Sequence, residues 1–252
     1  MPTLQEVYDN PKTTSRNPTT LAKRAGTTVA GAKRFLNSLS STQLGKRVVK
    51  QPAEAFAPTG GPRGTYLADT IHLSAYSGVN QKRTSVLCLV ESTSRYVYAR
   101  GLLRIASKNT AEALEEILEQ NHADVLAGRA APLVAIRCDG GPELRGEFAA
   151  LCEERVIPIE VTSAGTHERL SRLDRWVGTF RRMLGDLFDL TGGHVWFPHL
   201  QELVDNYNER PSRALIAAGP QTAPADVGPQ QDAALRRADM SRAAAVRTRT
   251  DR

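Results

Sequence analysis

Short apolar runs near the middle of the chain predict β-strands. Three runs rich in β-branched and aromatic residues, separated by turn-forming residues, occupy positions 66–73, 84–90 and 96–103. Their connections are short enough for tight hairpins. We therefore expect these three segments to form an antiparallel meander.

After the meander, the apolar spacing alternates between helical and strand-like periods. Residues 109–126 form a Glu-rich segment with an apolar helical stripe, and 133–138 reads as a buried strand. A helix at 147–155 and a strand at 156–161 follow. With a final helix, the order β-β-β-α-β-α-β-α predicts an α/β protein of the ribonuclease H-like fold, a mixed five-stranded sheet with flanking helices.

The final helix, from residue 169 onward, is amphipathic. Its apolar stripe consists of Leu170, Leu173, Val177, Phe180 and Leu184. Arginines occupy much of the remaining surface: Arg169, Arg172, Arg175, Arg181 and Arg182. We expect the stripe to pack against the sheet and the arginines to face outward.

The pattern before the meander predicts two short helices joined by a tight turn, within residues 21–36. Gly26 can adopt the left-handed conformation that ends the first helix, and Thr27 or Thr28 can cap the second. Lys33 and Arg34 point away from the second helix's apolar stripe. This resembles a helix-turn-helix that reads DNA, with a simple packing hairpin as the alternative.

Composition then divides the chain into four parts. A helical module (1–50) is followed by a linker rich in Pro and Gly (51–63), an α/β core (64–227) and a basic tail (228–252). Residues 1–65 carry ten Lys or Arg against three acidic residues, and residues 229–252 carry six against three. Basic arms favour a nucleic-acid partner, although solvated tails without specific function would look the same.

The three cysteines and the absence of long apolar runs indicate the compartment. Cys88, Cys138 and Cys152 are too few and too scattered for a disulfide framework, so we expect buried, reduced thiols. No run approaches the length needed to cross a bilayer, and the N-terminus lacks a signal-peptide pattern. We expect a soluble, intracellular protein without a membrane partner.

Three carboxylates stand out as candidate catalytic residues. Asp69 and Asp139 lie in or just after predicted strands, and Asp174 lies on the arginine-rich helix. Phosphodiester transfer needs an activated oxygen nucleophile, a stabilised leaving oxygen and neutralised phosphate charge. Two Mg²⁺ or Mn²⁺ ions held by carboxylates supply all three, so this layout predicts a two-metal phosphoryl-transfer site. Gly140 and Gly141 would allow the chain a sharp exit after Asp139.

The third carboxylate has alternatives. Asp174 could instead be an intrahelical partner of a neighbouring arginine, a contact of small energetic value when exposed. Glu168 is the nearest other carboxylate. Its separation from Asp139 fits a two-metal site less well than the 34 residues that lie between Asp139 and Asp174. We favour Asp174 as the metal ligand.

Five segments together resemble the catalytic core of retroviral-type integrases and DDE transposases, over roughly residues 64–227. The segment 86–97 is similar to the hydrophobic hairpin that follows the family's first Asp. Residues 139–144 resemble its Asp-Asn-Gly-x-Glu-Phe element, and 173–180 its Val-Glu-Arg-x-Asn-Arg-Thr-Leu element. Residues 205–211 and 221–227 resemble its Tyr-Asn-x-x-Pro and Thr-Pro elements.

The resemblance implies an integrase that processes the 3′ ends of mobile-element or viral DNA and joins them to target DNA. The sequence Leu-Asp-Arg-Trp at 173–176 is most similar to Maverick/Polinton-type integrases. The resemblance implies two Mg²⁺ or Mn²⁺ ions on Asp69, Asp139 and Asp174, a dimer or tetramer, and nuclear action in a eukaryotic host. The predicted phosphate-contacting residues are Lys33, Arg34, Arg169, Arg172, Arg175 and Arg182.

Two positions depart from the family pattern. Asp174 stands where the family has Glu and is one methylene shorter, and Gly140 stands where it has Asn. Two other functions therefore stay open: a DNA-binding protein that has lost catalysis, and a different nuclease of the ribonuclease H fold.

Overall fold

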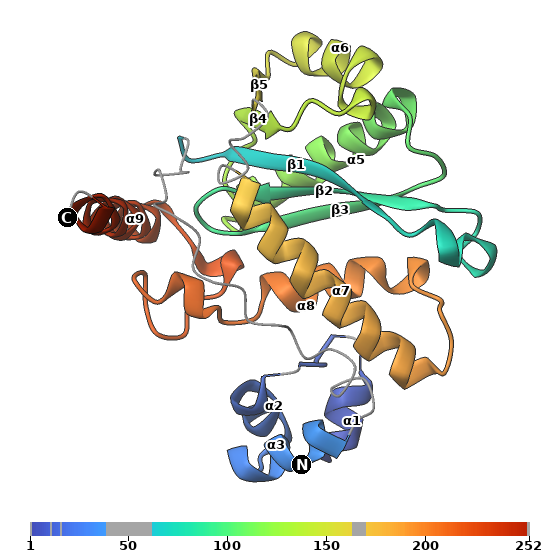
Figure 1. Ribbon diagram of the computed structural model, residues 1–252, viewed down its shortest axis with the longest axis vertical. Coiled ribbons are helices and arrows are strands. Elements are labelled where there is room, and N and C mark those ends of the chain that lie inside the picture. The colour runs from blue at the N-terminus through green and yellow to red at the C-terminus, as the bar shows by residue number, and fades with distance from the viewer. Residues whose placement is uncertain (1, 11, 16, 39–61, 163–169, 251–252) are drawn as a thin grey trace.

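The computed structural model describes residues 2–10, 12–15, 17–38, 62–162 and 170–250. Its centre is a five-stranded sheet with the strand order β3-β2-β1-β4-β5 (Figure 1). The strands are β1 (Thr65–His72), β2 (Ser85–Glu91), β3 (Val97–Leu102), β4 (Ala135–Cys138) and β5 (Ile159–Val161). The helices of the core are α5 (Ser107–Leu126), α6 (Gly146–Glu154), α7 (Ser171–Thr191) and α8 (Leu200–Asn208).

The sheet is mixed. Strands β1, β2 and β3 pair antiparallel, which confirms the predicted meander, whereas β4 pairs parallel to β1 and β5 parallel to β4. This mixed α/β architecture is consistent with the expected ribonuclease H-like fold. Because β1 and β4 are parallel neighbours, their carboxyl ends lie at the same edge of the sheet.

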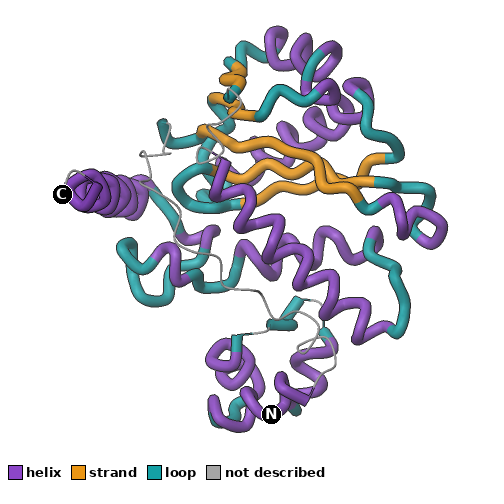
Figure 2. Tube along the Cα trace, viewed as in Figure 1, coloured by secondary structure: helices purple, strands orange, loops and turns teal. Residues whose placement is uncertain are grey.

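Helices cover both faces of the sheet, and Figure 2 shows the strands between them. Alternation along β1 sends Leu67 and Ile71 into the cluster shared with α7 and α8. The intervening Tyr66 and Ala68 join the opposite cluster, shared with α5 and α6. Asp69 has the parity of Leu67 and Ile71, so it lies on the α7 face.

Besides this apolar packing, one side chain of α8 forms hydrogen bonds with the sheet. The backbone N–H of Val97, on edge strand β3, donates to Asn208 Oδ1 (2.9 Å), and Asn208 Nδ2 donates back to the Val97 carbonyl (2.9 Å). The amide thus acts as a one-residue strand on the edge of β3. Asn208 belongs to the predicted Tyr-Asn-x-x-Pro element, so this element has a structural role.

Three helices precede the core: α1 (Leu4–Asp9), α2 (Pro18–Ala25) and α3 (Val29–Ser38). They share a small apolar cluster of their own. The predicted turn between α2 and α3 is present, because Gly26 adopts a φ of 63° and ends α2. Thr28 Oγ1 accepts from the N–H of Gly31 (3.1 Å), which is the expected cap of α3. These three helices pack below α7 in Figure 1.

The predicted basic tail is helical over most of its length, as α9 (Pro229–Thr250). Most of the predicted linker at 51–63 lies outside the described residues. All three cysteines are buried free thiols, as expected. Among the described helices, none is long and apolar enough to cross a membrane.

Candidate active site

The sheet brings Asp69 and Asp139 to the same place. The parallel register pairs Leu67 with Arg137, so Asp69 and Asp139 lie two residues further along neighbouring strands. Cys138 belongs to the cluster shared with α5 and α6. Asp139, with the opposite parity, therefore faces α7 together with Asp69.

Helix α7 supplies the third carboxylate. Leu173 and Trp176 are buried against the sheet, at 1% exposure each, which fixes the orientation of the first turn. Asp174 lies between them and is exposed. A carboxylate in the first turn also interacts favourably with the positive end of the helix dipole.

Three neighbouring carboxylates act electrostatically on Asp69. Burial first, and then the charges of Asp139, Glu143 and Asp174, raise the pKa of Asp69 to about 6 from an ordinary value near 3.8. The N–H of Thr70, which donates to Asp69 Oδ1 (2.7 Å), partly opposes this rise. Asp139, Glu143 and Asp174 are therefore near enough for their charges to act on Asp69.

Glu143 is a fourth acidic group that the sequence reasoning did not assign to the site. Its Oε1 accepts from the Thr70 hydroxyl (3.0 Å), one residue beyond Asp69 on the chain. The Thr110 hydroxyl of α5 donates to the Glu143 carbonyl (2.5 Å) and holds this loop against the helix. The Glu of the Asp-Asn-Gly-x-Glu-Phe element was the available signal for this residue.

The glycines after Asp139 shape the turn, as expected. Gly140 adopts a φ of 76°, and a Cβ at this position would lie 2.6 Å from Val161 Cγ1. A Cβ on Gly141 would lie 2.7 Å from Glu143 Oε2. The chain can thus turn sharply beside Asp139, whose Oδ1 accepts from the N–H of Gly141 (3.0 Å).

The donor set of the site suits Mg²⁺ or Mn²⁺, because hard divalent cations select carboxylate oxygens. Within the described part of the chain, no three Asp, Glu, His or Cys side chains are gathered closely enough to hold a metal ion as they stand. Asp69 Oδ1 and Asp139 Oδ1 each accept a backbone N–H. Glu168, the alternative ligand, lies outside the described residues.

Four of the six predicted DNA-contacting residues lie at the surface. Lys33 and Arg34 of α3, and Arg175 and Arg182 of α7, are exposed. Arg169 lies outside the described residues.

Arg172 requires a correction. The expectation that it faces outward is wrong, because it is 6% exposed and its guanidinium pairs with Asp239 of α9. Burial, together with the charge of Arg172, lowers the pKa of the neighbouring Arg95 to about 10. Arg172 therefore helps to dock α9 beside the start of α7, a role that no sequence spacing indicated.

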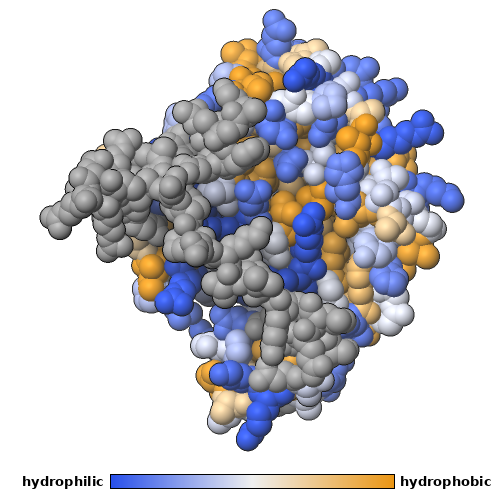
Figure 3. All heavy atoms as spheres, viewed as in Figure 1, coloured by the Kyte–Doolittle hydropathy of each residue, from blue (hydrophilic) through white to orange (hydrophobic). Residues whose placement is uncertain are grey.

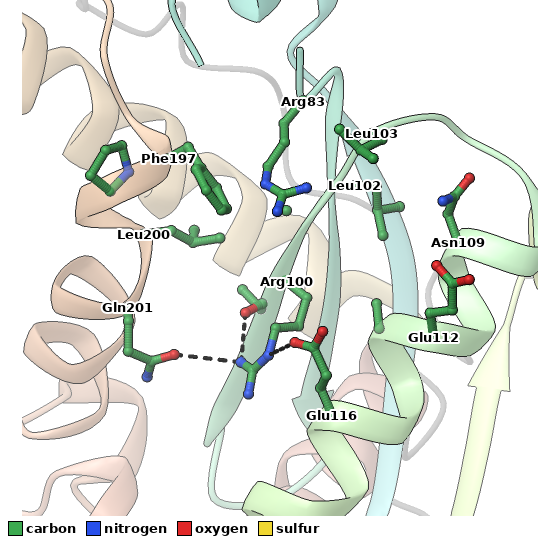
Figure 4. A pocket seen from close by; sticks show the side chains of 14 residues that line it. Arg83, Arg100, Leu102, Leu103, Asn109, Glu112, Glu116, Phe197, Leu200 and Gln201 are labelled. Carbon is green, nitrogen blue, oxygen red and sulfur yellow. Dashed lines mark hydrogen bonds and ion pairs between the residues drawn. The ribbon is translucent and has the colours of Figure 1, made fainter. Parts of the chain in front are cut away.

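A hollow lies along the outer edge of β3, between α5 and the start of α8, and is shown in Figure 4. Arg100 Nε donates to Glu116 Oε2 (3.0 Å) across it, and Nη1 to Gln201 Oε1 (3.5 Å). The Arg83 guanidinium carbon lies 4.0 Å from the centroid of the Phe197 ring. None of the candidate aspartates lines this hollow, which is separate from the candidate active site.

No protein-family model and no curated protein matches the chain. Among solved structures, it is similar to a chain from the cryo-EM structure of a simian T-cell lymphotropic virus intasome in complex with PP2A regulatory subunit B56 gamma. The match has a TM-score of 0.51 and 17% sequence identity, and covers 85% of this chain and 72% of the matched chain. At this identity the likeness concerns the fold alone.

Proposed function

We propose that the chain is an integrase-type polynucleotidyl transferase, which processes 3′ ends of mobile-element or viral DNA and joins them to target DNA. The convergence of Asp139 and Asp174 on the half-buried Asp69 is the observation that carries this proposal. The intasome likeness supports the same fold. Within this class, the sequence around Asp174 favours the Maverick/Polinton type.

In this proposal Asp69, Asp139 and Asp174 hold two Mg²⁺ or Mn²⁺ ions. Such ions supply Lewis-acid activation of the attacking oxygen and stabilisation of the leaving oxygen when bound. Asp69 presents its carboxylate from the rigid centre of the sheet, and the Thr70 N–H fixes one of its oxygens. Glu143 is a positioning residue, since it orients Thr70 and packs against Gly141.

The exposed cations supply DNA affinity in this proposal. Arg175 lies one residue from Asp174 and is exposed, so it can reach a phosphate near the reacting bond. Lys33 and Arg34 are exposed on α3, the second helix of the helix-turn-helix-like module. Joining two DNA ends to one target would require a dimer or tetramer.

The test is strand transfer into supercoiled plasmid in the presence of Mn²⁺, with a mixed pool of duplex donor ends. Asp139→Asn should lower joining by about 100-fold or more, because metal activation contributes several kcal/mol to the barrier. Glu147→Gln is the control, because this exposed carboxylate lies in the same segment and outside the site. Equal joining by wild type and Asp139→Asn would contradict the proposal.

A second candidate function is DNA binding without catalysis. It is favoured by the shorter Asp174 and by the present separation of the acidic side chains. Under this alternative, wild type and Asp139→Asn bind duplex DNA equally and neither joins donor ends. If the wild type does join donor ends, Asp174→Asn and Glu168→Gln distinguish the third ligand, since only the true ligand's variant loses joining.

A further inference from the structure

A pocket of about 360 Å³ lies where the N-terminal helices meet the core, and the three candidate aspartates do not line it. Thr14, Ser15 and Asn17 line it from the segment that leads into α2. Arg182 and Asp186 line it from α7, and Arg210 from the segment after α8. Neither the module nor the core forms this pocket alone.

Positive charge is concentrated around this pocket. Arg210 Nη1 donates to Ser15 Oγ (3.2 Å), and burial, together with the charge of Arg182, lowers the pKa of Arg210. Burial lowers the pKa of Arg24 in α2, and the nearby charge of Arg210 lowers it further. Among the described lining residues Asp186 is the one carboxylate, and the hydroxyl of Tyr8 donates to it (2.9 Å). The guanidinium groups thus outnumber the carboxylate.

The pocket also holds a polar group without a partner. Thr14 is 3% exposed, and its buried Oγ1 makes no hydrogen bond to any described residue. An unpaired buried hydroxyl is costly, so a polar partner at this position would lower the free energy of the folded chain. Ser15 Oγ accepts from Arg210 Nη1 and from the N–H of Asn17 (both 3.2 Å), which leaves its own hydrogen unused by these two bonds.

We propose that this pocket binds a phosphate of the DNA backbone, held by Arg182 and Arg210 and by the hydroxyls of Thr14 and Ser15. Guanidinium and hydroxyl donors are the groups that recognise phosphate oxygens, and the start of α2 adds a favourable dipole. Arg182 and Asn17 are exposed, so a phosphodiester can enter without displacing either domain.

The consequence is that DNA holds the module and the core together. The phosphate contacts α7 and the chain after α8 on one side, and the segment before α2 on the other. This inference rests on the proposed function to the extent that it names DNA as the source of the phosphate. The pocket itself follows from the contacts described above.

The experiment measures binding of a fluorescein-labelled duplex to the full chain in metal-free buffer over a range of salt concentrations. Arg182→Gln removes a lining cation, and Arg181→Gln removes the same charge from the next position of α7, outside the pocket. Thr14→Val removes the unpaired hydroxyl at nearly constant shape. Inorganic phosphate is titrated against each variant, with thermal unfolding as the readout.

We expect Arg182→Gln and Thr14→Val each to weaken duplex binding by about tenfold, the value of a hydrogen bond to a charged group. Arg182→Gln should also reduce the slope of log K against log salt by about one, whereas Thr14→Val should leave the slope unchanged. Arg181→Gln should have clearly less effect on affinity.

Two results would overturn the proposal. Equal losses for Arg181→Gln and Arg182→Gln, with no loss for Thr14→Val, would mean diffuse charge and no built site. Stabilisation by inorganic phosphate that Arg182→Gln abolishes, with unchanged duplex affinity, would assign the pocket to a free anion. Neither result bears on strand transfer, which is judged by Asp139→Asn, so the two proposals fail separately.

Discussion

Asp69 combines partial burial with three acidic neighbours, and this combination makes the metal-free protein sensitive to pH. Its pKa of about 6 lies above the ordinary 3.8. Between these two pH values the folded chain therefore keeps a proton on Asp69 that the unfolded chain has released. The contribution of Asp69 to the free energy of unfolding is therefore fully present below about pH 4 and is lost as the pH rises through 6.

Asp69→Asn removes this penalty. In metal-free buffer at pH 8 we expect the free energy of unfolding to rise by about 1–3 kcal/mol, because Asn carries no charge. Urea denaturation at pH 4.5 and pH 8 measures the effect, and the exposed Glu112→Gln serves as the control. A less stable Asp69→Asn at pH 8 would mean that the acidic neighbours do not destabilise the site.

Gly140 tests the turn beside Asp139. Gly140→Ala should destabilise the protein by about 1–3 kcal/mol more than Gly128→Ala, as measured by thermal unfolding. Both glycines have positive φ values, 76° and 72°, but only a Cβ on Gly140 meets another atom, Val161 Cγ1. Equal destabilisation would show that Val161 gives way.

At the scale of elements, apolar periodicity was sufficient to predict the helices and strands of the core. The meander, the two α/β alternations and the amphipathic α7 all appear within a few residues of their predicted bounds. The sequence pattern also placed Asp69 in a strand, Asp139 directly after one and Asp174 on a helix, and the structure has them on β1, after β4 and on α7. Their role as metal ligands stays a prediction. Arg172 was wrongly expected to face outward, and Glu143 was not assigned to the site. Their roles depend on contacts with Asp239 and Thr70, which are distant in the sequence.

The prediction at this scale concerns the stability of an Asn208 variant. Asn208→Ala leaves the N–H and carbonyl of Val97 unpaired in a buried place, and we expect a loss of about 2–4 kcal/mol in urea denaturation. Gln201→Ala, at an exposed position of the same helix, should change stability by less than about 1 kcal/mol. If the two variants behaved alike, the amide pair would not attach α8 to the sheet.

At the scale of the molecule, polar side chains join the N-terminal helices to the core. The hydroxyl of Tyr8 donates to the buried Asp186 of α7 (2.9 Å). Arg24 Nη1 donates to Asn206 Oδ1 (3.1 Å), and Asn206 Nδ2 donates to the carbonyl of Thr14 (3.0 Å). Figure 3 shows hydrophilic and hydrophobic residues interspersed on the visible face. Specific hydrogen bonds thus accompany the limited apolar contact at this junction.

Because Asp186 is 3% exposed, loss of its Tyr8 donor leaves a buried carboxylate with one bond fewer. Tyr8→Phe should therefore cost about 1–3 kcal/mol, and it should loosen the module before the core unfolds. Hydrogen exchange in α1 and α2 should speed up more than exchange in β1 and β2. Tyr76→Phe is the matched control, since the Tyr76 hydroxyl makes no hydrogen bond to a described residue and its ring packs on Phe188. Uniform acceleration across module and core would mean that the two unfold as one unit, and that the junction is as strong as the sheet itself.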